Sequence, residues 1–272
     1  MNDFSRFRAI RRKTDPFAVI LGANEIASAV AVALVRDGWS VVLSRDPSPP
    51  VVRRGMAFDD ALFGDRAALF EVSAERADTG FEVLAALGGP NRVVATPLGL
   101  LDLIVLRPLD LLVDARLQPA RERPDIRNLA RFAIGVGPGF VTAENCDVAL
   151  ALPPAALARL GGEDAGASGG RFLRAQRRGR WRTAVDLGAR AFRGFVVGHV
   201  VDGRDREPLA AEIDGVLVGV ARDGAEVAEG DIVAEVDART RQAAWSGLDP
   251  SGRAVAKAAL RAIETRAASV AV

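Results

Sequence analysis

The sequence lacks tyrosine and is poor in three other reactive residue types. His199 is its only histidine, Cys146 its only cysteine, and Lys13 and Lys257 its only lysines. A Tyr-x-x-x-Lys catalytic pair is therefore excluded. A zinc site of Cys and His ligands cannot be assembled within one chain, and no internal disulfide can form. If the protein is an enzyme, proton transfer falls mostly to Asp, Glu, Cys146 or His199.

Net charge is also nearly absent. The 36 basic and 35 acidic residues leave a formal charge of +1, so the sequence predicts neither nucleic-acid binding nor attraction to an anionic membrane. No apolar run reaches the roughly 18 residues of a membrane span. Residues 1–15 are basic without the apolar stretch of a secretory signal and are expected to be a disordered leader. With one cysteine, these features predict a cytoplasmic protein.

What the sequence does have is a run of apolar segments typical of an α/β fold. "FAVILG" at 17–22 predicts a buried strand, residues 23–38 a helix, and "WSVVLS" at 39–44 a second strand. The segments "AALFEV", "RVVAT", "LDLLVDAR" and "RFAIGVG" are further strand candidates, and "TGFEVLAALGG" is a helix candidate. We therefore expect a Rossmann-like, mostly parallel sheet over residues 16–152.

The composition changes after residue 152. Residues 153–190 are rich in Gly, Pro and Arg, which predicts a linker or excursion. Residues 191–272 contain short β-type runs between regularly spaced glycines and end in "SGRAVAKAALRAIETRA". This pattern predicts a small β-rich module with tight turns, followed by a closing helix.

The turn after the first predicted strand is a candidate nucleotide site. It reads Gly22-x-Asn24-x-x-Ala27, where a dinucleotide-binding turn has Gly-x-Gly-x-x-Gly or Ala. Asn24 can take the left-handed conformation of the second glycine, and the helix N-terminus would offer N–H groups to a phosphate. Glu25, however, would oppose a phosphate there, and Arg45 stands near the expected place of the ribose-binding acid. The pattern leaves open nucleotide binding or a Rossmann-like corner without a ligand.

Charged residues follow two of the predicted strands. Arg53 and Arg54 come after the second strand and could reach a phosphate or lie in a solvated loop. Asp114 and Arg116 stand at alternate positions at the end of "LLVDAR", so both would face one side of a continuing strand. They could bind a polar ligand or pair with each other.

A glycine-rich turn ends another predicted strand. In "IGVGPGF", Gly137-Pro138-Gly139 predicts a type II turn. At the carboxyl edge of a parallel sheet, such a turn lies where ligands bind, and Gly137 and Gly139 would let a ligand approach the backbone. A purely structural turn is the alternative. Cys146, which follows, has no basic neighbour in sequence and is expected to be a buried, inert thiol.

Taken together, several segments resemble the YqeB family of selenium-dependent molybdenum hydroxylase system proteins. The matching pieces are "VILGANEIASAVAVAL", "WSVVLSRDPSPPVVRRGMAFDDALFGD", "LLVDARL", "IGVGPGF" and "DGVLVGVARDGAEVAEGDIVAEVD", in the family's order. The resemblance singles out Gly22, the Arg53-Arg54 pair, Asp114 and the turn at 137–139. It implies a Rossmann-like domain followed by a biotinyl- or lipoyl-like β module, the barrel-sandwich hybrid.

The resemblance also implies an accessory role in cofactor maturation or handling for a molybdenum hydroxylase or a similar enzyme. A pterin- or nucleotide-like ligand, such as the molybdenum cofactor or NAD(P), would bind at the strand edge, and a client enzyme or cofactor-pathway protein would be the partner. No lysine lies between Lys13 and Lys257, so covalent biotin or lipoate is not expected, and no metal ligands are assigned. An NAD(P)-dependent oxidoreductase and a non-catalytic assembly protein are the alternatives. Whether the chain forms a homo-oligomer stays open.

Overall fold

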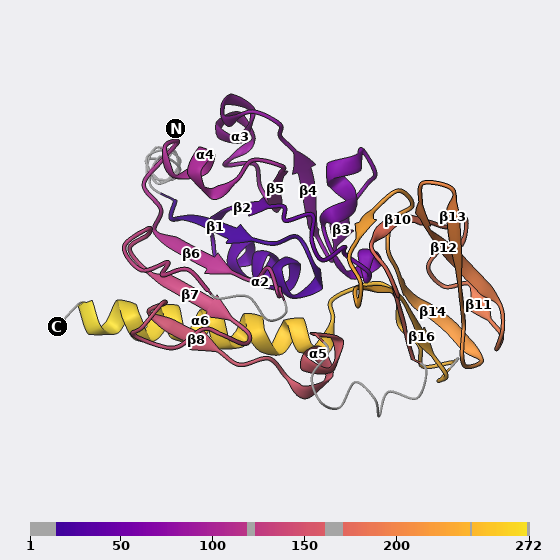
Figure 1. Cartoon of the computed structure of the whole chain (residues 1–272). Coiled ribbons are helices and arrows are strands. Elements are labelled where there is room, and N and C mark those ends of the chain that lie inside the picture. The colour runs from indigo at the N-terminus through magenta and orange to yellow at the C-terminus, as the bar shows by residue number, and fades with distance from the viewer. Residues whose placement is uncertain (1–14, 119–122, 161–170, 240, 271–272) are drawn as a thin grey trace.

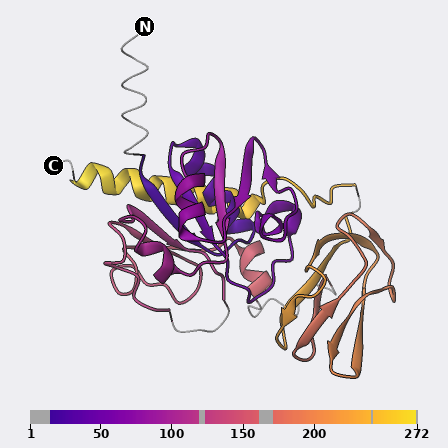
Figure 2. The ribbon, with the colours of Figure 1, turned by 90° about the horizontal axis from the view of Figure 1, so that it is seen from above.

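The computed structural model describes residues 15–118, 123–160, 171–239 and 241–270. Figure 1 shows two units side by side, an α/β unit and a smaller unit built only of strands. The view from above in Figure 2 shows the same separation. The expected basic leader lies, except for Asp15, outside the described residues. Within these ranges no helix is both long and apolar enough to cross a membrane.

The α/β unit is built on an eight-stranded sheet of order β3-β4-β5-β2-β1-β6-β7-β8. All neighbouring strands pair in parallel except β3 and β4, which form an antiparallel hairpin. The predicted mostly parallel sheet is therefore confirmed. The strands are β1 Phe17–Leu21, β2 Ser40–Ser44, β3 Ala68–Leu69, β4 Val72–Arg76, β5 Arg92–Thr96, β6 Leu111–Asp114, β7 Ala133–Val136 and β8 Val148–Leu150.

Helices cover both faces of this sheet, which explains why the central strands are apolar throughout. Every residue of β1 is buried. The helices α2 (Glu25–Arg36) and α6 (Pro250–Val270) pack on one face, and α3 (Gly80–Ala86) and α4 (Leu100–Ile104) on the other. Strand order reverses at β1, which lies between β2 and β6. The carboxyl edge at this switch point is where open α/β sheets bind ligands.

The second unit consists of two four-stranded antiparallel sheets around one apolar core. Trp181 is fully buried in this core, and its indole N–H donates to the Ala221 carbonyl. One sheet has the order β13-β12-β10-β15 and the other β11-β14-β16-β9. Their strands are β9 Phe172–Arg174, β10 Gly179–Arg182, β11 Arg190–Ala191, β12 Val196–Asp202, β13 Asp205–Ala210, β14 Gly215–Val220, β15 Glu226–Val227 and β16 Ile232–Asp237.

The structure corrects two expectations about boundaries. Residues 153–190 are not simply a linker, because β9 and β10 fall within them and each pairs in a sheet of the second unit. Their outward-facing arginines gave these strands a polar, loop-like composition; in β10 only Trp181 is buried. Residues 161–170 lie outside the described residues. The short helices α5 (Pro154–Leu157) and η3 (Ala158–Leu160) precede them.

The closing helix is present, but it does not belong to the β module. After the second unit the chain returns, and α6 packs along α2 of the α/β unit (Figure 1). The two helices approach closely at Gly252, where a Cβ would lie 2.7 Å from that of Ala29. The strand-built unit is therefore an insertion between two parts of the α/β unit.

The segment after β2, which belongs to the α/β unit, also joins the two units because it contacts the second unit. The Val52 carbonyl accepts a hydrogen bond from Val220 N at 2.9 Å, at the end of β14. Gly219 makes room for this contact, because a Cβ there would lie 2.7 Å from Cγ1 of Val52. Two short helices follow, η1 (Arg54–Met56) and η2 (Asp59–Phe63). The loop that leaves the carboxyl edge of the sheet is thus held by the second unit.

Candidate functional site

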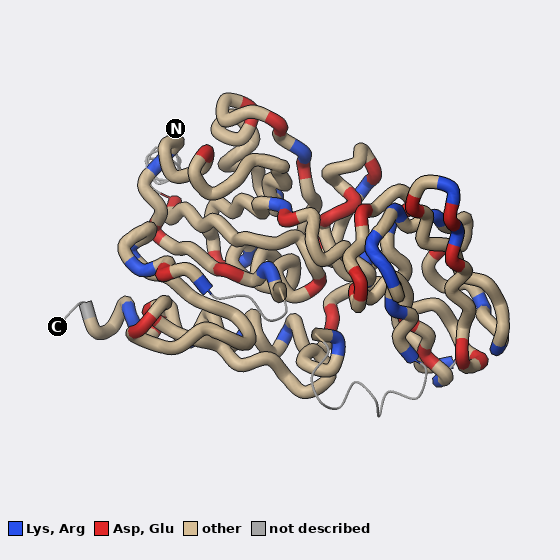
Figure 3. Tube along the Cα trace, in the orientation of Figure 1, with Lys and Arg blue, Asp and Glu red and all other residues tan. Residues whose placement is uncertain are grey.

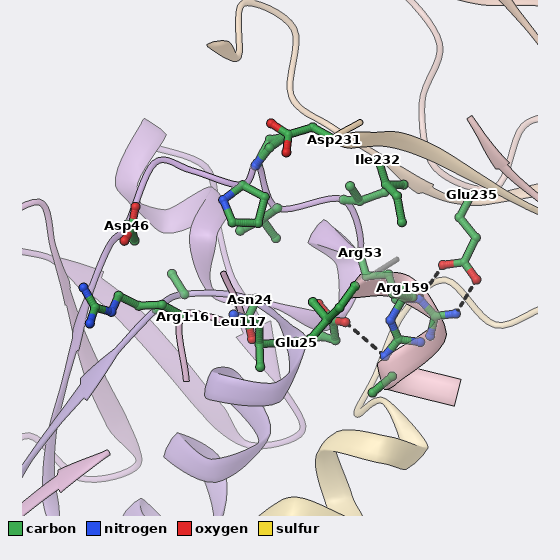
Figure 4. Close-up of a pocket in the computed structure, with 18 of the residues that line it drawn as sticks. Asn24, Glu25, Asp46, Arg53, Arg116, Leu117, Arg159, Asp231, Ile232 and Glu235 are labelled. Atoms are coloured by element: carbon green, nitrogen blue, oxygen red, sulfur yellow. Dashed lines mark hydrogen bonds and ion pairs between the residues drawn. The ribbon is translucent and has the colours of Figure 1, made fainter. Parts of the chain in front are cut away.

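A cavity of about 460 Å³ lies between the two units, a volume typical of small-molecule sites. Figure 4 shows Asn24, Glu25 and Leu117 of the α/β unit on one side and Asp231 and Ile232 of the second unit on the other. The cavity opens at the carboxyl edge of β1 and β6. The lining residues are 22–25, 46, 49–53, 116, 117, 156, 159, 160, 174, 229–232 and 235.

The turn after β1 forms the floor of this cavity. Gly22 has φ of 109°, and a Cβ there would lie 2.7 Å from the Ala115 carbonyl oxygen, so both conformation and space require glycine. Asn24 does not take the left-handed conformation expected of it: its φ and ψ are −72° and 179°. It is instead the N-cap of α2. Its Oδ1 accepts from Ile26 N and Ala27 N, both at 3.0 Å.

This cap changes the expected chemistry of the turn. The two N–H groups that a dinucleotide phosphate would use are already satisfied by Asn24. The Nδ2 group of Asn24 donates to the Ala115 carbonyl at 2.7 Å, which locks the side chain in place. Glu25 also lines the cavity, as the sequence indicated, and adds negative charge. Arg45 turns to Asp59, with Nε 3.1 Å from Oδ1. The residues present do not favour a dinucleotide bound in the usual way.

Asp114 and Arg116 pair with each other, one of the two alternatives left open by the sequence. Asp114 is fully buried at the end of β6, and Nη2 of Arg116 lies 2.5 Å from its Oδ2. The hydrogen bond that Arg116 donates to Asp114 raises the pKa of Arg116 against the opposing effect of burial. Only Arg116 reaches the cavity. Asp114 therefore orients this arginine, whose side chain is 24% exposed.

Arg53 lines the cavity, but its guanidinium is held by hydrogen bonds to two carboxylates, one of them in the second unit. Its Nε and Nη2 donate to the two carboxylate oxygens of Glu235 at 2.7 and 2.8 Å, and its Nη1 donates to Asp249 at 2.6 Å. Burial alone would raise the pKa of Glu235, but the hydrogen bond and charge of Arg53 lower it. The sequence left open a phosphate ligand or a solvated loop at Arg53; in the structure its guanidinium is buried and forms a clamp between the units.

Arg54 does not line the cavity. Its Nε donates to the Val220 carbonyl at 2.9 Å, and its guanidinium pairs with Asp60. Figure 3 shows acidic and basic residues next to one another where the two units meet. The Arg53-Arg54 pair thus serves the interface.

The clamp is part of a buried, charge-balanced network that sequence reasoning missed. Arg159 of η3 lies 3.1 Å from Glu25 and 3.5 Å from Asp249, and Arg171 also pairs with Glu235. Three arginines and three carboxylates thus meet at one side of the cavity, and four of the six line it. Asp249 in addition accepts from Gly252 N at 2.9 Å in the first turn of α6. Only contacts between segments far apart in the chain reveal this set.

The second unit supplies the wall that the sequence did not indicate. Arg174 of β9 is the cross-strand partner of Ile232, and Asp231 directly precedes β16. Both Arg174 and Asp231 line the cavity. Nη1 of Arg174 donates to the Gly230 carbonyl at 3.0 Å, while its Nη2 is buried and has no hydrogen-bond partner among the described residues. The sequence predicted a linker for the stretch that contains Arg174 and a tight turn for the stretch that contains Asp231, so neither was a candidate site residue.

The glycine turn after β7 is not part of the cavity. Gly139 has φ of 85°, as the expected turn requires, but neither it nor Gly137 lines the cavity. A Cβ at Gly137 would lie 3.7 Å from Leu117, which places the turn behind a lining residue. Cys146 is fully buried, and burial raises the pKa of its thiol, which agrees with an inert side chain. No group of three or more His, Cys, Asp or Glu placed to hold a metal occurs among the described residues.

Comparison with known proteins places the chain beside one curated relative, although no family model matches it. The apo structure of the ectoine utilization protein EutE from Ruegeria pomeroyi is 13% identical, covers 82% of this chain and 86% of its own, and gives a TM-score of 0.25. An aspartoacylase family protein from Mesorhizobium loti is 13% identical, covers 82% and 85%, and gives 0.26. These likenesses are too weak to bear on fold or function.

The curated relative is the "Uncharacterized protein YqeB" of Escherichia coli strain K12, which is 28% identical over 261 residues. The match covers 90% of this chain and 47% of the relative, so the chain spans about half the length of the protein it matches. The match bears out the resemblance carried by the motifs: the chain is a divergent relative of YqeB.

Proposed function

We propose that the protein is an accessory factor that binds a pterin- or nucleotide-like ligand in the cavity between its units and handles a cofactor for a molybdenum hydroxylase or a similar enzyme. The hydroxylase part of the proposal draws on the YqeB resemblance. The ligand part draws on the cavity itself. Its volume of about 460 Å³ suits a ligand of cofactor-fragment size.

The position of the cavity is the observation that carries the proposal. It lies at the switch point of the sheet, where β1 is flanked by β2 and β6. Apolar side chains such as Val51, Leu117 and Ile232 line it together with charged ones. A flat heterocycle can pack on apolar walls of this kind while polar groups fix its orientation.

The cap on α2 favours this reading over the oxidoreductase alternative. Asn24 satisfies the N–H groups of Ile26 and Ala27, so a pyrophosphate at this turn would lose the donors on which dinucleotide binding depends. We therefore propose that NAD(P) is not the ligand.

We further propose that the second unit is a biotinyl- or lipoyl-like module that has lost its carrier role. Its two antiparallel sheets with glycine turns support this, as does the absence of lysine between Lys13 and Lys257. In this chain the module would close the cavity and hold the loop after β2 through Arg53.

The proposal is tested by native mass spectrometry of the protein purified from its own host. A non-covalent small molecule should accompany the wild type and be missing from Val51→Trp, which fills the cavity. Val105→Trp, at a side chain that is 78% exposed on the α/β unit, is the matched control and should retain it.

The accessory role has its own test. In a host strain that lacks the gene, molybdenum hydroxylase activity should fall, and wild type and Val105→Trp should restore it whereas Val51→Trp should not. Unchanged hydroxylase activity in the deletion strain would contradict the accessory role. Micromolar binding of NADH or NADPH would favour the oxidoreductase instead.

A further inference from the structure

Four arginines line the cavity among the residues that the structure describes, and one differs from the rest. Arg53, Arg116 and Arg159 each lie within 4.0 Å of a carboxylate. Nη2 of Arg159 and Nη2 of Arg174 are both buried without a hydrogen-bond partner among the described residues, but of the four arginines Arg174 alone has no ion pair in the described part of the chain. Buried polar groups in native proteins are nearly always paired. Arg174 thus carries unused donor capacity at the cavity wall.

Asp231 is the complementary group on the same wall. Its Oδ2 accepts from Ala228 N at 2.8 Å, which leaves further acceptor capacity on the carboxylate. Burial raises the pKa of Asp231, opposed by that hydrogen bond and by the charge of Arg174. Burial likewise lowers the pKa of Arg174, opposed by the charge of Asp231. The charges of the two groups interact, yet within the described part of the chain neither group is in an ion pair.

The backbone holds this pair in a fixed relation. Ala175 N donates to the Asp231 carbonyl at 2.8 Å, and Gly230 N donates to the Ala175 carbonyl at 2.7 Å. The residue that follows Arg174 is therefore bonded on both sides of the turn that bears Asp231. A donor and an acceptor whose backbones are fixed relative to each other on one wall select a ligand by the pattern of its polar edge rather than by its charge.

We infer that Arg174 and Asp231 read the amino-oxo pyrimidine edge that pterins and guanine share. The exocyclic oxygen of that edge accepts from Arg174, and the ring N–H and the amino group donate to Asp231. Adenine presents the reversed pattern. A simple anion such as phosphate is disfavoured, because the carboxylates of Glu229 and Asp231 line the same wall. The inference deepens the proposed function and rests on the cavity being the ligand site.

Titration calorimetry with four ligands tests the edge: 6-hydroxymethylpterin, GMP, IMP and AMP. The first two carry the complete edge, IMP lacks the amino group, and AMP reverses donor and acceptor. We expect 6-hydroxymethylpterin or GMP to bind at least tenfold more tightly than IMP and AMP, since a lost hydrogen bond to a charged group costs about tenfold or more. The ligand that binds more tightly of the first two identifies the source of the edge.

Substitutions then assign the edge to its residues. Arg174→Gln and Asp231→Asn should each weaken binding of the preferred ligand about tenfold or more. They should also reduce the ratio of its affinity to that of AMP. Arg177→Gln and Asp205→Asn are the matched controls and should bind as the wild type does, because these side chains of the same unit, 39% and 73% exposed, do not line the cavity. Thermal unfolding shows that each variant is folded.

The outcomes separate the inference from the proposed function. If ligand binding survives Arg174→Gln and Asp231→Asn but is lost in Val51→Trp, recognition of the edge by these two residues is refuted, and the cavity is still supported as the ligand site. If all four ligands bind equally, or if neither 6-hydroxymethylpterin nor GMP binds at millimolar concentration, recognition of the edge is also refuted. Native mass spectrometry then still decides whether the cavity binds a ligand. Binding that survives Val51→Trp would overturn both.

Discussion

Replacing Arg53 with methionine should destabilise the protein more than replacing any exposed arginine. The side chain of Arg53 is 9% exposed and makes three hydrogen bonds to the carboxylates of Glu235 and Asp249. Methionine has a comparable length but no donors, so the variant leaves two buried carboxylates with fewer partners. Removing one member of a buried ion pair costs about 3–5 kcal/mol. For a domain of this size, that corresponds to a fall in Tm of roughly 6–20 °C.

The effect should also depend on pH. Because the folded-state pKa of Glu235 lies below its usual 4.5, the network contributes stability that is present above about pH 4.5 and lost as the pH falls through the folded pKa. In Arg53→Met that pKa rises, since the partner that lowers it is gone. The variant then takes up a proton that the wild type does not, and the stability difference narrows as the solution is acidified.

Calorimetric unfolding at pH 7 and at pH 4.5 measures both effects. Arg180→Met is the matched control, because its ion pair with Glu226 is more than half exposed on both sides, and such pairs contribute about 0–1 kcal/mol. If Arg53→Met melts within about 1 °C of Arg180→Met at pH 7, or if its deficit grows on acidification, the clamp between the units is not what the geometry indicates.

Three further predictions concern the floor of the cavity and the second unit. Gly22→Ala should cost about 1–3 kcal/mol, because φ is 109° and the new Cβ meets the Ala115 carbonyl; chemical denaturation measures this, and a neutral result would contradict the close approach. Asn24→Ala should cost about 1 kcal/mol through loss of the α2 cap, whereas Asn24→Gly should cost only a few tenths; equal losses in thermal melts would argue against capping. Intact-mass measurement on protein from the native host should show no biotin or lipoate, and an added mass of either would have to map to Lys13 or Lys257.

The local parts of the fold could be predicted because their information is local. The apolar run 17–21 and the helical spacing that follows it produce β1 and α2 wherever the chain is packed. The turn Gly137-Pro138-Gly139 likewise has its φ values set by its own residues. The sheet as a whole follows, since continuous apolar strands must be covered on both faces.

The candidate site depended on partners far along the chain. The sequence indicated that Asn24 could substitute for glycine, but its Oδ1 caps α2, and its Nδ2 is held by a carbonyl 91 residues away. Arg53 read as a phosphate ligand, but its acceptors lie 182 and 196 residues away. Nothing in a local pattern says which distant charge will neutralise an arginine.

The sequence by itself determined local elements such as β1 and α2, the glycine at position 22 and the nearly neutral charge balance. Only the tertiary structure decided that strands β9 and β10 arise from an arginine-rich stretch, that α6 returns to pack on α2, and that the cavity lies between two units. Hydrogen bonding and apolar periodicity act within a few residues and can be read along the chain. The pairing of charges and the closure of a cavity depend on burial, which exists only once distant segments have been brought together.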